Sequence, residues 1–326
     1  MEIYGTMGPS CKNAEVLYKL IGNGMTGIRL NLSHAMLQDF MEGLEELHKA
    51  CKLSGKDIDI MADIEGPELR IGALKNEMNL TEGSYVLFAT EEDENTIPVM
   101  KELLEYIDKE TEILLDDGKI LLNRDGNAFK VIRGGVLSSK KSIKLIHNEI
   151  KRDTLTVNDF KNISAFKKHN VTKVMLPFVR NKDDIKALRS ALDTADCPDV
   201  KIYAKIENEE GVANLDGIIE ECDCIVIARG DLGNAYGLTK LPIIQEEIVK
   251  KCVMAKREFL IVTDMLASMC ESKIPTRAET SDIYRAVMEG ASALMLTNET
   301  AIGKNPTDAM KVMKETVEET LKYKNN

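Results

Sequence analysis

The sequence predicts a (β/α)₈ barrel, a closed ring of parallel strands surrounded by helices, with a small β-rich domain inserted after the third strand. Three observations lead to this prediction. Eight short aliphatic runs recur along the chain, segments with helical spacing separate most of them, and one long interval carries hairpin signals instead. We expect the barrel to comprise residues 1–72 and 147–326, and the inserted domain residues 73–146.

Each of the eight runs is rich in Ile, Val, Leu or Met, as expected for a parallel strand that is buried on both faces. The runs are Glu2–Thr6, Gly27–Asn31, Ile58–Asp63, Lys173–Phe178, Lys201–Ile206, Cys224–Arg229, Phe259–Thr263 and Ala293–Thr297. Helical spacing of apolar residues is found between them in Val16–Ile21, Phe40–Leu53, Ile185–Leu192 and Leu241–Cys252. An open doubly wound sheet is the alternative, but its usual glycine-rich turns, G-x-G-x-x-G after the first strand or G-x-x-x-x-G-K-[ST], do not occur.

The interval between the third and fourth runs interrupts this alternation. It contains strand-like stretches accompanied by Asp-Gly pairs, which are a hairpin signal. The stretches are Gly83–Phe88, Ile113–Leu115 and Phe129–Ile132, and the pairs are Asp117-Gly118 and Asp125-Gly126. An insertion into a loop at the active face of a barrel is most simply a lid.

Composition narrows the function classes. A net charge of −11 argues against a protein that holds nucleic acid through a basic surface, so an anionic substrate would need a local cluster of Arg and Lys. Neither a signal peptide nor an 18-residue apolar run is visible, which predicts a cytoplasmic protein without a membrane anchor. The seven irregularly spaced cysteines indicate reduced thiols, and only four histidines argue against a His-rich zinc site. Any metal should therefore be hard and bound by oxygen.

The carboxyl ends of the predicted strands carry an unusual set of charged residues, and in a barrel these ends converge on one face. Glu207 and Asp231, at neighbouring strand ends, could share one Mg²⁺ or Mn²⁺. Lys205 lies two residues before Glu207 on the same strand face, where its charge suits a phosphoryl group in transfer. Arg29 and Arg70 supply further cations. The alternative for Lys205 is a buried ion pair with Glu207 or Asp231.

Several segments resemble the pyruvate kinase family and occur in the family's order through almost the whole chain. They are Gly5–Ser10 (GTMGPS), Arg29–His34 (RLNLSH), Asp63–Gly72 (DIEGPELRIG), Leu115–Gly118 (LDDG), Ala204–Gly211 (AKIENEEG), Ala228–Gly233 (ARGDLG), Pro275–Glu279 (PTRAE) and Met295–Ala301 (MLTNETA). The resemblance implies a phosphotransferase that moves phosphate from phosphoenolpyruvate to ADP, giving pyruvate and ATP, with Mg²⁺ (or Mn²⁺) and K⁺ as cofactors.

The resemblance also implies a role for each matching residue. Lys205 would stabilise the phosphoryl group in flight, and Arg29 would bind the phosphate of phosphoenolpyruvate. The divalent metal would be held by Glu207 and Asp231. The substrate carboxylate would bind the backbone N–H groups of Gly230 and Asp231 together with Thr263, which also lies on the route of enolate protonation. K⁺ would bind Asn31, Ser33, Asp63 and the carbonyl of Ile64. ADP would contact Pro9, Asn31, His34, Arg70 and Lys140 or Lys141. Glu68 matches the K⁺-dependent members.

Some positions depart from the family pattern. The chain stops after the barrel's last helix, so we expect the regulatory C-terminal domain to be absent, and a homodimer or monomer in place of the usual tetramer. Glu65 stands where the family has Lys, Asp264 where it has Gln, and Lys144–His147 replaces the Asn-Leu-Pro-Gly lid hinge. Two alternatives therefore stay open: a related barrel that uses another phosphoryl acceptor or acts as an enolate lyase, and a non-catalytic phosphoenolpyruvate-binding protein.

Overall fold

A computed structural model describes residues 1–33, 35–116, 118–146 and 152–326. The chain divides into two compact units: unit 1 comprises residues 1–66 and 154–326, and unit 2 comprises residues 67–153. The limits predicted for the inserted domain, 73–146, lie inside unit 2.

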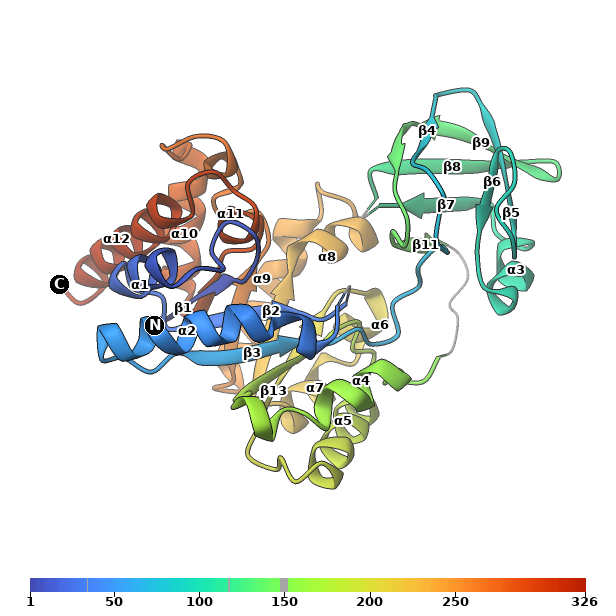
Figure 1. Cartoon of the computed structure of the whole chain (residues 1–326). Helices are drawn as coiled ribbons and strands as arrows, with labels where there is room; N and C mark the ends of the chain where they lie inside the picture. Colours follow the sequence, from blue (N-terminus) through green and yellow to red (C-terminus); the bar gives the residue numbers. More distant parts are fainter. Residues whose placement is uncertain (34, 117, 147–151) are drawn as a thin grey trace. The chain divides into compact units, whose positions relative to one another are not determined.

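The strands of unit 1 form a closed barrel (Figure 1), so the predicted (β/α)₈ fold is confirmed. Their order around the ring is β1-β16-β15-β14-β13-β12-β3-β2, and every neighbouring pair is parallel. Each strand matches one predicted run, with ends that differ by a residue or two. The strands are β1 (Glu2–Thr6), β2 (Gly27–Asn31), β3 (Asp59–Asp63), β12 (Lys173–Leu176), β13 (Lys201–Ile206), β14 (Cys224–Ala228), β15 (Glu258–Val262) and β16 (Ala293–Met295).

Helices connect these strands, and their ends follow ordinary capping chemistry. The side chain of Asn13 accepts a hydrogen bond from the N–H of Val16 at 2.9 Å where α1 begins, and Gly55, with φ of 67°, ends α2. The helices are α1 (Ala14–Gly22), α2 (Met41–Ser54), α4 (Val157–Ile163), α5 (Lys182–Thr194), α6 (Glu209–Ala213), α7 (Leu215–Glu221), α8 (Arg229–Tyr236), α9 (Leu241–Met254), α10 (Arg277–Glu289), α11 (Asn298–Ala301) and α12 (Pro306–Lys324), with 3₁₀ turns at Leu37–Phe40, Lys167–His169 and Ala267–Cys270. Within the described part of the chain, no helix has both the length and the apolar character needed to cross a bilayer.

One of the differences in strand ends changes the position of a predicted site residue. The sixth run was expected to continue through Arg229, but β14 ends at Ala228 and α8 begins at Arg229. Asp231 therefore lies in the first turn of a helix and not at a strand end.

Two apolar layers stabilise unit 1. The larger lies between the strands and the surrounding helices, and the smaller fills the inside of the barrel with side chains such as Tyr4, Met61 and Tyr203. The ring of Tyr4 lies so close to β2 that a Cβ atom on Gly27 would come within 2.2 Å of it. Only glycine leaves room for this ring, and the packed interior is typical of barrels of this kind.

The amino-terminal end of the barrel is closed by a buried lysine. Lys173 begins β12, and its Nζ lies 2.8 Å from Glu2 Oε1 and 2.8 Å from Asp59 Oδ2. It also donates a hydrogen bond to the Tyr4 hydroxyl, and it lies 5.1 Å and 5.6 Å from the centres of the Tyr4 and Tyr203 rings. This ammonium is therefore fully surrounded by acceptors and aromatic faces.

Unit 2 has a hydrophobic core of its own, built on β-strands as predicted. A six-stranded sheet has the order β11-β7-β8-β9-β5-β6, and a second sheet pairs β10 with β4. The strands are β4 (Met78–Leu80), β5 (Tyr85–Ala89), β6 (Thr96–Pro98), β7 (Glu112–Leu115), β8 (Ile120–Asp125), β9 (Ala128–Arg133), β10 (Gly135–Leu137) and β11 (Ile143–Leu145). Gly126, with φ of 62°, turns the hairpin between β8 and β9. The unit also contains a helix, α3 (Lys101–Ile107), that the sequence analysis did not predict.

Candidate active site

Lys205 stands at the centre of a charged cluster at the carboxyl end of the barrel. It is the last residue but one of β13, and only 15% of its side chain is exposed. Its Nζ lies 3.0 Å from Glu207 Oε1 and 3.6 Å from Asp63 Oδ1. Burial alone would lower the pKa of Lys205, but the charges of Asp63, Glu207 and Asp231 outweigh it and raise that pKa above its usual range. The lysine is therefore a permanent cation at neutral pH.

Asp63 joins this lysine to Arg29, which is mostly buried. Arg29 contacts Asp63 Oδ2 through Nε at 2.8 Å and through Nη2 at 2.6 Å, across neighbouring strands β2 and β3. Burial would raise the pKa of Asp63, yet Lys205 and Arg29 together hold it below the usual value. Among the described residues, Asp63 Oδ1 has no hydrogen-bond partner. A buried carboxylate oxygen in this state is an available ligand for a cation.

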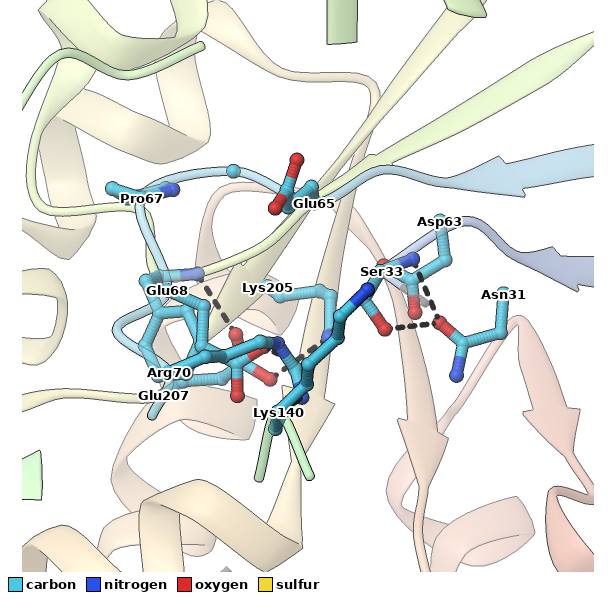
Figure 2. A network of polar contacts seen from close by, with 12 residues as sticks. Asn31, Ser33, Asp63, Glu65, Pro67, Glu68, Arg70, Lys140, Lys205 and Glu207 are labelled. Atoms are coloured by element: carbon cyan, nitrogen blue, oxygen red, sulfur yellow. Dashed lines mark hydrogen bonds and ion pairs between the residues drawn. The ribbon is translucent and has the colours of Figure 1, made fainter. Parts of the chain in front are cut away.

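The oxygen atoms expected to bind K⁺ lie near this carboxylate oxygen. Asn31 is the direct neighbour of Asp63 in the β2–β3 pairing. Ser33 Oγ donates a hydrogen bond to Asn31 Oδ1 at 2.7 Å, a contact drawn in Figure 2. Ile64 follows Asp63 directly and is buried. Amide, hydroxyl, carboxylate and carbonyl oxygens are the donors that a hard monovalent cation requires, so these residues fit the ion.

Glu207 and Asp231 are the carboxylates expected to hold a divalent metal. Glu207 is 1% exposed, and its Oε2 accepts a hydrogen bond from the N–H of Phe178 at 2.8 Å. Asp231 lies close enough to Lys205 for its charge to raise the pKa of that lysine. No group of three or more Asp, Glu, His or Cys side chains that could enclose a metal occurs among the described residues. Two carboxylates are compatible with Mg²⁺ or Mn²⁺, because such an ion is usually bound by one or two protein carboxylates and keeps its other positions for water and substrate oxygens.

Gly230 and Thr263 lie side by side next to this cluster. A Cβ atom placed on Gly230 would be 3.4 Å from Thr263 Cγ2 and 3.9 Å from its Oγ1. Gly230 and Asp231 belong to the first turn of α8, so their backbone N–H groups lie at the positive end of the helix. Such N–H groups beside a hydroxyl can bind a carboxylate.

The residues expected to contact a nucleotide are divided between the two units. In unit 1, Pro9 lies exposed in the turn after β1, while His34 lies outside the described residues. In unit 2, Arg70 donates to the carbonyl of Lys140 at 2.9 Å and pairs with Glu68 (Figure 2). Lys141 Nζ lies 2.8 Å from Asp116 Oδ1. Unit 2 thus gathers Arg70, Lys140 and Lys141 in one place.

Glu65, the residue that departs from the family pattern, has defined partners. Its Oε2 accepts hydrogen bonds from Thr156 Oγ1 at 2.9 Å and from Asn158 Nδ2 at 3.2 Å. Its own N–H, at 2.8 Å, and that of Gly66, at 3.0 Å, donate to the carboxylate of Asp159. The carboxyl group of Glu65 therefore helps to fix the chain where it leaves β3.

Asp159 is a structural residue of the site that the sequence analysis missed. It is fully buried, and its carboxylate accepts the N–H groups of Glu65 and Gly66 as well as that of Thr156 at 2.9 Å. Burial raises the pKa of Asp159 although these hydrogen bonds act in the opposite direction. The available signal was the capping pattern Thr156-x-x-Asp159 at the start of α4. Asp159 thereby ties the start of α4 to the segment that follows Asp63.

A (β/α)₈ barrel with a buried cation, an Asp-Arg pair and two metal-compatible carboxylates at its carboxyl end defines a class of enzymes that act on phosphorylated anions. The family model described as the pyruvate kinase barrel domain matches residues 1–310. The chain therefore belongs to the pyruvate kinase family.

Curated relatives agree with this assignment. The chain is 34% identical to the pyruvate kinase of Thermococcus litoralis over 333 residues, which cover 99% of this chain and 70% of the relative. It is 35% identical to that of Aeropyrum pernix, with 96% and 69% covered. It is 34% identical to that of Geobacillus stearothermophilus, with 96% of this chain but only 55% of the relative covered. Similarity at this level over nearly the full chain supports pyruvate kinase function.

Proposed function

We propose that this protein transfers the phosphoryl group of phosphoenolpyruvate to ADP, giving pyruvate and ATP, with Mg²⁺ (or Mn²⁺) and K⁺ as cofactors. The observation that carries the proposal is the cationic Lys205, held 3.0 Å from Glu207 and 3.6 Å from Asp63 inside the mouth of the barrel. A charge fixed in advance beside metal-binding carboxylates is what a phosphoryl group in transfer requires.

In this proposal, the phosphate of phosphoenolpyruvate binds beside Arg29 and Lys205. Arg29 uses Nε and Nη2 on Asp63, and its planar guanidinium retains further N–H donors for an anion. The substrate carboxylate binds the N–H groups of Gly230 and Asp231 and the hydroxyl of Thr263. These groups orient the substrate so that its phosphoryl group faces the acceptor.

The cofactors would be held by the oxygen donors described above. Glu207 and Asp231 would bind the divalent metal, which supplies charge neutralisation for the phosphoryl oxygens. Asn31, Ser33, Asp63 and the carbonyl of Ile64 would bind K⁺. Asp63 Oδ1 supports the K⁺ assignment, because this buried oxygen accepts no hydrogen bond among the described residues and the Nζ of Lys205, at 3.6 Å, lies beyond hydrogen-bond distance.

For the nucleotide, we propose contacts from Pro9, Asn31 and His34 of unit 1 and from Arg70, Lys140 and Lys141 of unit 2. The gathering of Arg70, Lys140 and Lys141 in unit 2 supports a phosphate-binding role for it. The inserted domain, 73–146, would then act as a lid that excludes water during transfer.

The alternative of a different acceptor or an enolate lyase was motivated by the changes at Asp264, at the lid hinge Lys144–His147 and at Glu65, where the charge is reversed. Its hydrogen bonds to Thr156 and Asn158 give this carboxylate a structural role, which weakens that motive. Lys205 counts against the alternative of a pure phosphoenolpyruvate-binding protein, because a protein that only binds has little need of a lysine that stabilises the phosphoryl group in transfer.

A coupled assay that measures pyruvate from phosphoenolpyruvate tests the proposal. We expect pyruvate formation to require ADP, Mg²⁺ and K⁺ together, with omission of each component as a control. Tight binding of phosphoenolpyruvate by calorimetry without pyruvate above background would reject the kinase reaction. Full activity without K⁺ would contradict the assignment of the K⁺ ligands.

A further inference from the structure

Two consecutive residues after β15 adopt a left-handed backbone conformation. Thr263 has a φ of 83° and Asp264 a φ of 54°, and neither is glycine. For a β-branched residue such as threonine this region is a true outlier, because its Cβ substituents crowd the backbone. Such a conformation persists only when the surrounding structure holds it, and it is concentrated at functional sites.

The side chain of Arg229 holds this segment. Its Nε and Nη2 both donate to the carbonyl oxygen of Thr263, at 3.1 Å and 2.5 Å, and Nη2 also lies 3.1 Å from Met265 Sδ. The third nitrogen, Nη1, lies 2.5 Å from Asp282 Oδ2 on α10. Arg229 is 13% exposed, so these contacts are largely shielded from water. The rigid guanidinium therefore links Asp282 to one particular carbonyl group.

The position of Arg229 in the sequence connects this contact to the substrate site. Arg229 is the first residue of α8, and Gly230 and Asp231 follow it. Thr263 Cγ2 would lie 3.4 Å from a Cβ atom on Gly230, so the side chain of Thr263 packs against the backbone that Arg229 begins. The segment Arg229–Asp231 thus contains both the arginine that holds Thr263 and the N–H groups that we propose bind the substrate carboxylate.

We propose that Arg229, held by Asp282, is a positioning residue that sets the direction of the Thr263 hydroxyl through the backbone of Thr263. The proposal rests on the proposed function. Phosphoryl transfer produces the enolate of pyruvate. A proton then adds to its methylene carbon and forms a C–H bond, while the C–C double bond is replaced by the C–O double bond of pyruvate. Thr263 is the hydroxyl expected on that route, so its direction controls protonation. Arg229 itself does not touch the substrate.

Arg189 provides a matched control. It also combines backbone carbonyls with an aspartate: Nη1 donates to Pro198 at 3.1 Å and to Val200 at 2.9 Å, and Nη2 lies 3.1 Å from Asp223 Oδ2. Its carbonyl partners lie before β13, at the amino end of the barrel. Loss of Arg189 removes the same kinds of contact without affecting the carboxyl end.

The experiment compares Arg229→Ala, Arg229→Lys and Asp282→Asn with Arg189→Ala in the full chain. For each we would measure kcat, the KM for phosphoenolpyruvate, the thermal midpoint and the exchange of pyruvate methyl protons for deuterium in D₂O with ATP, Mg²⁺ and K⁺. Arg229→Ala should lower kcat and the exchange rate by about 10²-fold, the typical cost of displacing a reacting group. Arg189→Ala should lower the thermal midpoint but leave kcat within about twofold.

The two conservative variants keep the proposal testable if Arg229→Ala does not fold. Arg229→Lys and Asp282→Asn should each lower the exchange rate more than they raise the KM. Wild-type exchange in a folded Arg229→Ala or Arg229→Lys protein would overturn the proposal.

A crystal structure of the folded variant separates this proposal from the proposed function. Retention of a positive φ at Thr263 after loss of Arg229 would overturn the positioning role, and relaxation of Thr263 would support it, whatever the activity. Absence of pyruvate formation by the wild-type protein would instead reject the proposed function.

Discussion

The barrel contains a lysine at each end, Lys173 fully buried and Lys205 mostly buried, and the two are held differently. At the amino end, Lys173 Nζ lies 2.8 Å from both Glu2 and Asp59 and also donates to the Tyr4 hydroxyl. At the carboxyl end, Lys205 Nζ lies 3.0 Å from Glu207 but 3.6 Å from Asp63. One lysine has all its donors satisfied within the protein, and the other retains capacity for a ligand.

Strand β3 makes the contrast clear because it supplies a carboxylate to each lysine, Asp59 at one end and Asp63 at the other. Asp59 binds Lys173 closely, whereas Asp63 keeps Oδ1 without a hydrogen-bond partner among the described residues. The same residue types thus serve stability at the amino end and ligand binding at the carboxyl end. This division is general in (β/α)₈ barrels.

Replacing Lys205 should have the largest effect. We expect Lys205→Ala to lower kcat by about 10²–10³-fold, as for loss of one preorganised electrostatic donor. Steady-state kinetics with phosphoenolpyruvate, ADP, Mg²⁺ and K⁺ would measure it, and circular dichroism would show that the variant is folded. A normal kcat in Lys205→Ala would show that Lys205 has no role in the mechanism, and that the two lysines do not differ in function.

Replacing Lys173 should affect stability and not catalysis. Lys173→Met removes a cation that is 5% exposed, and Glu2 and Asp59, exposed by 40% and 33%, can then be hydrated. We therefore expect a loss of about 2 kcal/mol in the free energy of unfolding, below the cost of breaking a fully buried pair. Denaturant unfolding would measure this loss. A fall in kcat comparable to that of Lys205→Ala would show that the two ends are not distinct.

The contribution of Lys173 should disappear in alkali. Burial would lower its pKa, but the hydrogen bonds to Asp59 and Glu2 outweigh burial and raise it above the usual value. A lysine whose folded pKa exceeds its unfolded pKa stabilises the fold fully below about pH 10.4 and loses this effect as the pH rises through the folded value. The stability difference between wild type and Lys173→Met should therefore stay constant up to about pH 10.4 and shrink over the range above it. A difference that stays constant over this range would contradict the ion-pair explanation.

The smallest effect concerns a carboxylate at the catalytic end that we expect to be structural. Glu65→Gln weakens the hydrogen bonds from Thr156 and Asn158, and should cost about 1 kcal/mol of stability. The KM for ADP should not change, and Asn158→Ala serves as the matched control because it removes the 3.2 Å partner. A selective change in the KM for ADP in Glu65→Gln alone would give this residue a nucleotide role.

The eight barrel strands could be predicted from the sequence because each is buried on both faces and therefore forms a continuous aliphatic run. The end of β14 was misplaced because Gly230 and Asp231 are poor helix formers, so the pattern gave no sign that α8 begins at Arg229. The helix α3 was missed because its seven residues are too few to show clear periodicity.

The site residues of the strand ends were predictable for a related reason: parallel strands bring their carboxyl ends together whatever the details of packing. The Lys173 cluster was not predicted, because charged residues at the start of a strand usually face water. Its contact with Glu2 runs across the inside of the barrel, since β12 and β1 are not neighbours in the ring. The Arg229 contact with Thr263 depends on backbone angles that no sequence pattern specifies.

The insertion of unit 2 bears on the order of folding. Strands β3 and β12 pair directly in the barrel although residues 64–172 separate them in the sequence. Closing so long a segment of free chain has an entropic cost that grows with its length. Within unit 2, however, Arg152 donates to the carbonyls of Pro67 at 3.2 Å and Glu68 at 2.8 Å, which brings the two ends of the unit together. Once unit 2 has folded around its own core, the remaining loop is short, so early folding of the insertion would speed closure of the barrel.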